Sequence, residues 1–113
     1  MNDRMQTLGV VGRLFPLILS GEKTSTIRWR EPRIVPGLMT YVSDDDANAI
    51  AFVNVVRCTD MPLHAVAAFL GKTDEWPDEV LLAGMREHYP AIELTEIVQV
   101  IEHEPCADAH ASR

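Results

Sequence analysis

The order of short strand-like and helix-like segments is the feature that most constrains the fold. A strand is followed by a helix, three strands, two helices and a final strand. The strand-like segments are Thr7–Val11, Lys23–Trp29, Leu38–Val42, Ile50–Cys58 and a last one from Ile97 to Glu102. This order lacks the regular strand–helix alternation of a doubly wound parallel sheet. We therefore expect an α+β fold, in which five or six strands form a small mixed β-barrel with short helices around it.

The segment before the second strand carries clear helix signals. Leu14, Leu17 and Ile18 recur at helical spacing, and Pro16 is tolerated in a first helical turn. Gly21 is a typical C-terminal helix stop. The sequence therefore predicts a helix over Phe15–Ser20 directly before the strand that begins at Lys23.

Two further segments give specific expectations about burial. Ile50–Cys58 is an almost continuous apolar run, which is typical of a strand buried on both faces. A helix is predicted from about His64 to Leu70, with a stop at Gly71. Pro77 is expected at the first position of another helix. That helix is predicted to end before Tyr89-Pro90 and to bury Val80, Leu81 and Met85, with Leu82 beside them.

The composition of the 113 residues is that of an ordinary globular domain, with 47% hydrophobic and 24% charged residues. We expect a single domain over 1–113, with a core from about 7 to 104 and a frayed tail over 105–113. Charged residues at Asp3, Arg4 and Arg13 interrupt any secretory signal, and no apolar stretch is long enough to span a membrane. Cys58 and Cys106 have no metal-ligand spacing, so a reducing cytoplasm is the expected location.

Charge is distributed unevenly along the chain. The net charge of −7 argues against a protein that coats DNA or RNA non-specifically. Residues 1–33 nevertheless hold six basic and three acidic residues, whereas the remainder holds four basic and fourteen acidic ones. The segment from Lys23 to Arg33 is therefore interpreted as a local anion-facing site. The alternative is a solvated loop with ordinary arginines.

Alternation along the strand at 23–29 separates polar from apolar side chains. Ile27 is expected to face the core together with Ser25 and Trp29, because residues two apart share a face. The opposite face then carries Thr24, Thr26, Arg28 and Arg30, with Lys23 close enough to join them. Such a row is a plausible floor for a polar ligand, although an exposed strand face of this composition is also common.

The segment Gly21-Glu22-Lys23-Thr24-Ser25-Thr26-Ile27-Arg28 resembles the G-x-K-x-x-x-x-R signature of the ASCH domain, a relative of the PUA fold. Pro36-Gly37 and Tyr89-Pro90 also match that family in position, and the similarity spans roughly Thr7 to Glu104. The resemblance implies a PUA-like mixed β-barrel with an RNA-associated role.

One bacterial branch of that family is similar in a further respect, because it also carries Thr at the position of Thr26. That branch removes the acetyl group from acetylcytidine with a Lys, a Thr and a Glu. Lys23 and Thr26 match the first two, and the acidic partner corresponds to Asp74 or Glu75. Thr26 would act as nucleophile, Lys23 as base, and the carboxylate would orient or relay the proton. A ribonuclease activity, proposed for another branch, is a second alternative.

The remaining candidate groups point to binding or packing. Trp29 and Trp76 are suited to stacking on a base, or to core packing. No histidine has metal-ligand spacing, so neither a metal nor a cofactor is expected. We predict an RNA or nucleoside-like ligand as the partner. The predicted ligand-binding residues are Gly21, Thr24, Arg28, Trp29 and Arg30, and the predicted catalytic residues are Lys23, Thr26, Asp74 and Glu75.

Overall fold

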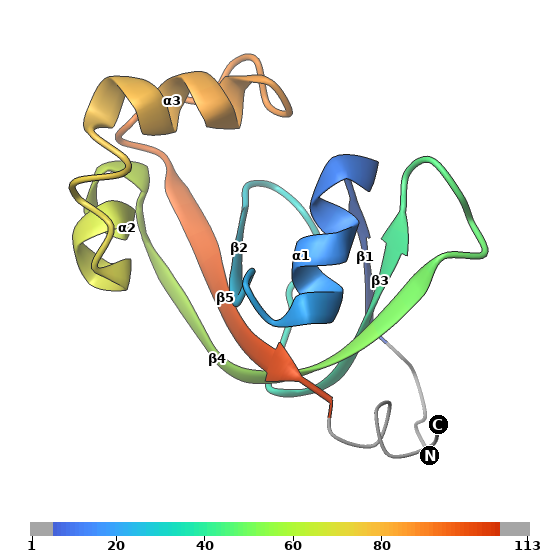
Figure 1. The fold of residues 1–113 in the computed structure, drawn as a ribbon. Helices are drawn as coiled ribbons and strands as arrows, with labels where there is room; N and C mark the ends of the chain where they lie inside the picture. The colour runs from blue at the N-terminus through green and yellow to red at the C-terminus, as the bar shows by residue number, and fades with distance from the viewer. Residues whose placement is uncertain (1–5, 107–113) are drawn as a thin grey trace. The chain divides into compact units, whose positions relative to one another are not determined.

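The computed structural model describes residues 6–106, which form five strands and three α-helices (Figure 1). The elements are β1 (Gln6–Val10), the 3-10 turn η1 (Gly12–Leu14), α1 (Phe15–Ser20), β2 (Ser25–Arg28), β3 (Gly37–Ser43), β4 (Ile50–Pro62), α2 (Leu63–Leu70), α3 (Asp78–Arg86) and β5 (Ile97–Pro105). This order confirms the predicted succession of strands and helices.

The five strands form one mixed sheet in the order β1-β3-β4-β5-β2. Strand β1 pairs with β3 in parallel, whereas β3 pairs with β4 antiparallel. A doubly wound parallel sheet is therefore excluded, and the predicted α+β class is confirmed. The sheet is consistent with a PUA-like barrel. Among the described residues, no helix combines the length and apolar character needed to cross a membrane.

The chain divides into two compact units, which are described in turn. The first consists of the described residues 6–26, 34–58 and 101–106, and the second of Ile27–Arg33 and Thr59–Val100. Strands β2, β4 and β5 each contribute residues to both units.

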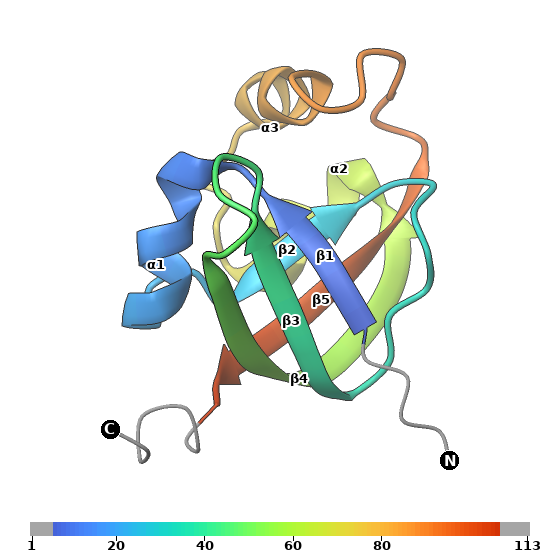
Figure 2. The same cartoon turned by 90° about the vertical axis from the view of Figure 1, so that its right-hand side faces the viewer.

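The core of the first unit lies on one face of β1, β3 and the first part of β4, which run side by side in Figure 2. The register places Leu8 opposite Tyr41 and Tyr41 opposite Ala51, so these side chains share the buried face. The buried side chains of this core are Leu8, Val10, Ile18, Ile34, Met39, Tyr41, Ala51, Val53, Val55 and Ile101.

The prediction that Ile50–Cys58 is buried on both faces is wrong. Ala51, Val53 and Val55 are buried, but the alternate side chains, among them Phe52 and Val56, are exposed. The physical reason is the antiparallel pairing with β3, since an antiparallel pair commonly buries only one face. An unbroken apolar run does not by itself distinguish a strand with one buried face from a strand with two.

The core of the second unit is formed by helices α2 and α3 together with Trp29, Ile92 and the start of β5. Leu81 and Met85 of α3 are buried as predicted, but Val80 is half exposed, contrary to the prediction. Pro77 is the N-cap of α3, so the helix begins one residue later than expected. Leu81 and Met85, four residues apart, define one narrow buried stripe, and Val80 lies beside it rather than in it.

Both helix stops predicted at glycine are confirmed. Gly21 ends α1 with a φ of +85°, and Gly71 ends α2 with a φ of +73°. An L side chain is disfavoured in this left-handed region, which explains why glycine occupies both positions. Strand β5 continues to Pro105, and residues 107–113 of the predicted frayed tail lie outside the described residues.

Candidate functional site

Strand β2 is shorter than predicted, and this changes how the polar row is arranged. It covers only Ser25–Arg28, so Lys23 precedes the strand and Arg30 follows it. Thr26 is buried and Thr24 is exposed, whereas Arg28 keeps 13% of its side chain exposed. The regular alternation that was expected to align Thr24, Thr26, Arg28 and Arg30 on one face therefore does not extend over the whole segment.

The predicted catalytic residues are divided between the two units. Lys23 and Thr26 belong to the first unit, while Asp74 and Glu75 belong to the second. Their joint participation in one site stays a prediction. Each unit contains its own constellation of polar side chains, and these are described separately.

The first unit contains a buried polar pair next to the motif lysine. The Tyr41 hydroxyl lies 2.8 Å from Nε2 of His103, and the two rings meet edge to face with centroids 5.3 Å apart. The backbone N–H of His103 donates to the carbonyl oxygen of Thr24 at 2.9 Å. Nζ of Lys23 donates to the carbonyl oxygen of Ser25 at 2.6 Å. The motif segment is thus tied to β5 at a buried histidine.

Burial and the positive charge of Lys23, in that order of size, lower the pKa of His103 to about 4. At neutral pH the imidazole is therefore uncharged, and it can exchange a hydrogen bond with the Tyr41 hydroxyl. Sequence reasoning examined His103 only for metal binding and missed this role. The available signal was its spacing in the last strand, two residues after the buried Ile101.

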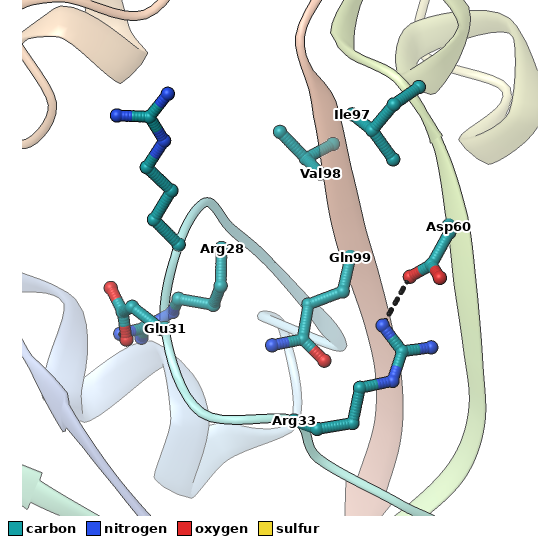
Figure 3. Close-up of a pocket in the computed structure, with 8 residues that line it drawn as sticks. Arg28, Glu31, Arg33, Asp60, Ile97, Val98 and Gln99 are labelled. Atoms are coloured by element: carbon teal, nitrogen blue, oxygen red, sulfur yellow. Dashed lines mark hydrogen bonds and ion pairs between the residues drawn. The ribbon is translucent and has the colours of Figure 1, made fainter.

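The second unit contains a small open pocket of about 130 Å³. Charged side chains form much of its lining, and Figure 3 shows Gln99 between the Arg28–Glu31 side chains and the Arg33–Asp60 pair. The lining residues are Arg28, Arg30, Glu31, Arg33, Asp60, Ile97, Val98 and Gln99. Three arginines and two acidic residues therefore line one pocket in a chain whose net charge is −7.

The loop Trp29–Arg33 provides several of the residues that line this pocket. Hydrogen bonds and an ion pair hold its successive residues Glu31 and Pro32. The Tyr89 hydroxyl donates a short hydrogen bond to Glu31, which also pairs with Arg28 at 3.3 Å. Gln99 donates through Nε2 to the carbonyl oxygen of Pro32 at 2.9 Å. Burial and the Glu31 carboxylate raise the pKa of Tyr89 to about 12, so the phenol keeps the proton that it donates.

An ion pair holds one end of the loop, and aromatic packing holds the other. Arg33 pairs with Asp60 at 2.6 Å, as the dashed line in Figure 3 marks. Trp29 is 8% exposed and meets the Tyr89 ring edge to face, with the ring centroids 6.0 Å apart. The loop therefore has contacts at both of its ends and at its middle residues.

Arg30 differs from the other two arginines of the pocket. Its φ of +58° lies in the left-handed region, where a non-glycine residue is disfavoured. Its guanidinium lies over the Trp29 ring, 4.2 Å from the centroid. Within residues 6–106 it makes no hydrogen bond and no ion pair. Arg30 thus offers an uncommitted cation, and Trp29 supports that cation instead of presenting a free face of its own.

The acidic candidates lie in the segment between α2 and α3. Asp74 and Glu75 are exposed, and neither lines the pocket. Glu75 pairs with Lys72 at 3.5 Å, and the Lys72 ammonium lies over the Trp76 ring. In the part of the chain that the structure describes, no three His, Cys, Asp or Glu side chains gather as metal ligands.

Comparison with known proteins identifies the fold. No family model and no curated protein matches the chain. Among solved structures, the ASCH protein from Zymomonas mobilis superposes with a TM-score of 0.64 at 13% identity, over 87% of this chain and 65% of that protein. Protein EF3133 from Enterococcus faecalis, of family DUF984, superposes with a TM-score of 0.65 at 15% identity, over 93% of this chain and 82% of that protein.

These similarities show that the chain has an ASCH-like fold. The chain spans about two thirds of the length of the Zymomonas protein. At this level of identity the likeness defines the fold and carries no statement about ligand or activity.

The depressed pKa of His103 predicts a specific loss of stability in acid. Because the pKa is about 4 in the folded state and about 6.5 in the unfolded state, the unfolded chain binds the proton more readily. The stabilisation is complete above pH 6.5 and is lost as the pH falls toward 4. Between pH 7 and pH 5 the wild type is expected to lose about 2 kcal/mol through this group.

Urea denaturation of the wild type and of His103→Gln at both pH values checks this expectation. His103→Gln removes the titrating group, so its free energy of unfolding should fall by about 2 kcal/mol less than that of the wild type. An equal fall in the two proteins would mean that His103 is not held neutral by the fold.

Proposed function

We propose that this chain is an ASCH-fold binding module that recognises RNA or a nucleoside-like ligand around the segment Gly21–Arg30, and that it acts in the cytoplasm. The observation that carries the proposal is the gathering of Arg28, Arg30 and Arg33 on one pocket of an otherwise acidic chain. Guanidinium groups are well suited to phosphate and to planar bases, because they offer several donors in one plane.

The charge distribution further supports a compact site. A protein that follows a long nucleic acid without specificity carries an extended basic surface, whereas this chain has a net charge of −7. Its basic residues concentrate between Lys23 and Arg33, where the signature that resembles ASCH proteins also lies. A ligand of one or a few nucleotides fits this distribution better than a long RNA track.

Binding can be tested by isothermal titration with cytidine and with a hexacytidylate RNA. We expect at least one of them to bind, and Arg28→Gln to weaken binding by about tenfold, the range expected for a lost charged hydrogen bond. Arg86→Gln is the matched control, because Arg86 belongs to the same unit, pairs with Glu93 and does not line the pocket. Absence of binding to both ligands, or an equal loss in both variants, would contradict the proposal.

Hydrolysis of an acylated nucleoside is the second candidate function, and the Lys23–Thr26 spacing favours it. Both residues belong to the first unit and lie three positions apart in the sequence. In this reaction Lys23, in its neutral amine form, accepts the proton of the Thr26 hydroxyl as the Thr26 oxygen attacks the acetyl carbonyl. Lys23 returns the proton to the departing amine, and water then hydrolyses the acetyl ester.

Acetate release from acetylcytidine tests this second function. Thr26→Val removes the hydroxyl at nearly constant volume, and Lys23→Ala removes the base. Each is expected to lower kcat by about a thousandfold or more, because such groups act as a unit. Thr95→Val, at an exposed threonine, is the control and should leave turnover unchanged. Turnover of Thr26→Val within about threefold of the wild type would exclude Thr26 as nucleophile.

A further inference from the structure

We propose that the pocket of the second unit is a subsite for a single phosphodiester group, with Arg30 as its contacting residue. The ligand is then an oligonucleotide rather than a free nucleoside. This inference rests on the proposed binding function and narrows the class of ligand that the module takes.

Among the charged residues that line the pocket, the arginines outnumber the carboxylates by one. The carboxylate of Glu31 is engaged by Arg28 and by the Tyr89 hydroxyl. The carboxylate of Asp60 is engaged by Arg33 at 2.6 Å. Three guanidiniums against two carboxylates give a net charge of +1, and Arg30 is the group that no carboxylate of the described residues neutralises. One excess positive charge complements the single negative charge of a phosphodiester.

A terminal phosphate monoester is a poorer match for the same pocket. Such a group carries a charge of roughly −1.5 to −2 near pH 7. Its second charge would face Glu31 and Asp60, whose own partners already occupy them, and like charges at short range repel. The charge pattern therefore favours an internal phosphate of a nucleic acid chain over the end of a mononucleotide.

The backbone at Arg30 supports a binding role for its guanidinium. A residue held at positive φ costs the fold of order 1–3 kcal/mol, and such strain is concentrated at functional positions. Glycine would relieve the strain at φ +58°, yet the position carries arginine with its guanidinium on the Trp29 ring. Stacking on a buried indole limits the freedom of the side chain, so less rotamer entropy is lost when an anion binds.

The size of the pocket agrees with one phosphate group. Its volume of about 130 Å³ is well below the roughly 300–1,000 Å³ of sites that enclose a drug-sized molecule. A pocket of this size accommodates one phosphate group more readily than a base with its ribose. Ile97 and Val98 line the pocket beside the charged groups, and Ile97 is 57% exposed. Val98 is only 2% exposed, so Ile97 is the apolar side chain against which the neighbouring ribose can pack.

A comparison of charged and uncharged backbones tests the proposal. The probes are a fluorescein-labelled hexacytidylate RNA, the same hexamer with methylphosphonate linkages, and cytidine, each titrated by anisotropy or by calorimetry. The wild type should bind the phosphodiester RNA at least tenfold more tightly than the methylphosphonate. Arg30→Gln should remove most of that difference and leave affinity for the methylphosphonate nearly unchanged. It should also lower the salt slope by about one.

Two further variants keep the test decisive. Arg30→Gly releases the left-handed strain and removes the guanidinium, so it should fold and show the same loss as Arg30→Gln. Arg86→Gln removes a guanidinium that is paired elsewhere in this unit and should bind all probes like the wild type.

Each outcome bears on one claim or on both. Equal affinity of the wild type for the two hexamers, or an equal effect of Arg30→Gln and Arg86→Gln, would overturn the phosphodiester subsite while leaving RNA binding in place. Binding of cytidine alone would overturn the subsite and retain the nucleoside form of the proposed function. Absence of binding to all three probes would overturn both.

Discussion

The carboxylate of Glu31 holds the loop that follows β2, because it pairs with Arg28 and accepts a hydrogen bond from the Tyr89 hydroxyl. The same Tyr89 ring packs edge to face on Trp29, and Trp29 in turn lies beneath the Arg30 guanidinium. The Glu31 carboxylate therefore fixes Tyr89. Tyr89 positions Trp29, and Trp29 supports the Arg30 guanidinium. The pocket of the second unit depends on these contacts, since Arg30 and Arg33 belong to this loop and Arg28 directly precedes it.

In the first unit, by contrast with the charged open pocket of the second, polar side chains lie inside an apolar core. Tyr41 is fully buried among aliphatic side chains, and a buried hydroxyl without a partner is costly. His103 supplies that partner and itself remains uncharged beside Lys23. The lysine of the signature thereby lies close enough to a neutral histidine to lower its pKa.

Local signals predicted the helix ends and the fold class, whereas contacts between distant segments had to come from the structure. Gly21 and Gly71 identify helix ends because the left-handed conformation is a property of one residue. The exposed face of β4 escaped prediction, because burial depends on which strands pair with it. The basic segment pointed to Arg28 and Arg30, which line the pocket. Asp60 and Gln99, which also line it, and Tyr89, which holds Glu31, come from positions far along the chain. The hydrogen bond of His103 likewise depends on the distant Tyr41.

The most direct measurement is a crystal structure of the protein with a cytidine dinucleotide, which contains a single phosphodiester and no terminal phosphate. The predicted result is one non-bridging phosphate oxygen within hydrogen-bond distance of the Arg30 guanidinium, with that guanidinium still stacked on Trp29 and the Glu31–Tyr89 contact retained. A dinucleotide bound with its phosphate in solvent and Arg30 uninvolved would contradict the assignment of the loop as the binding element.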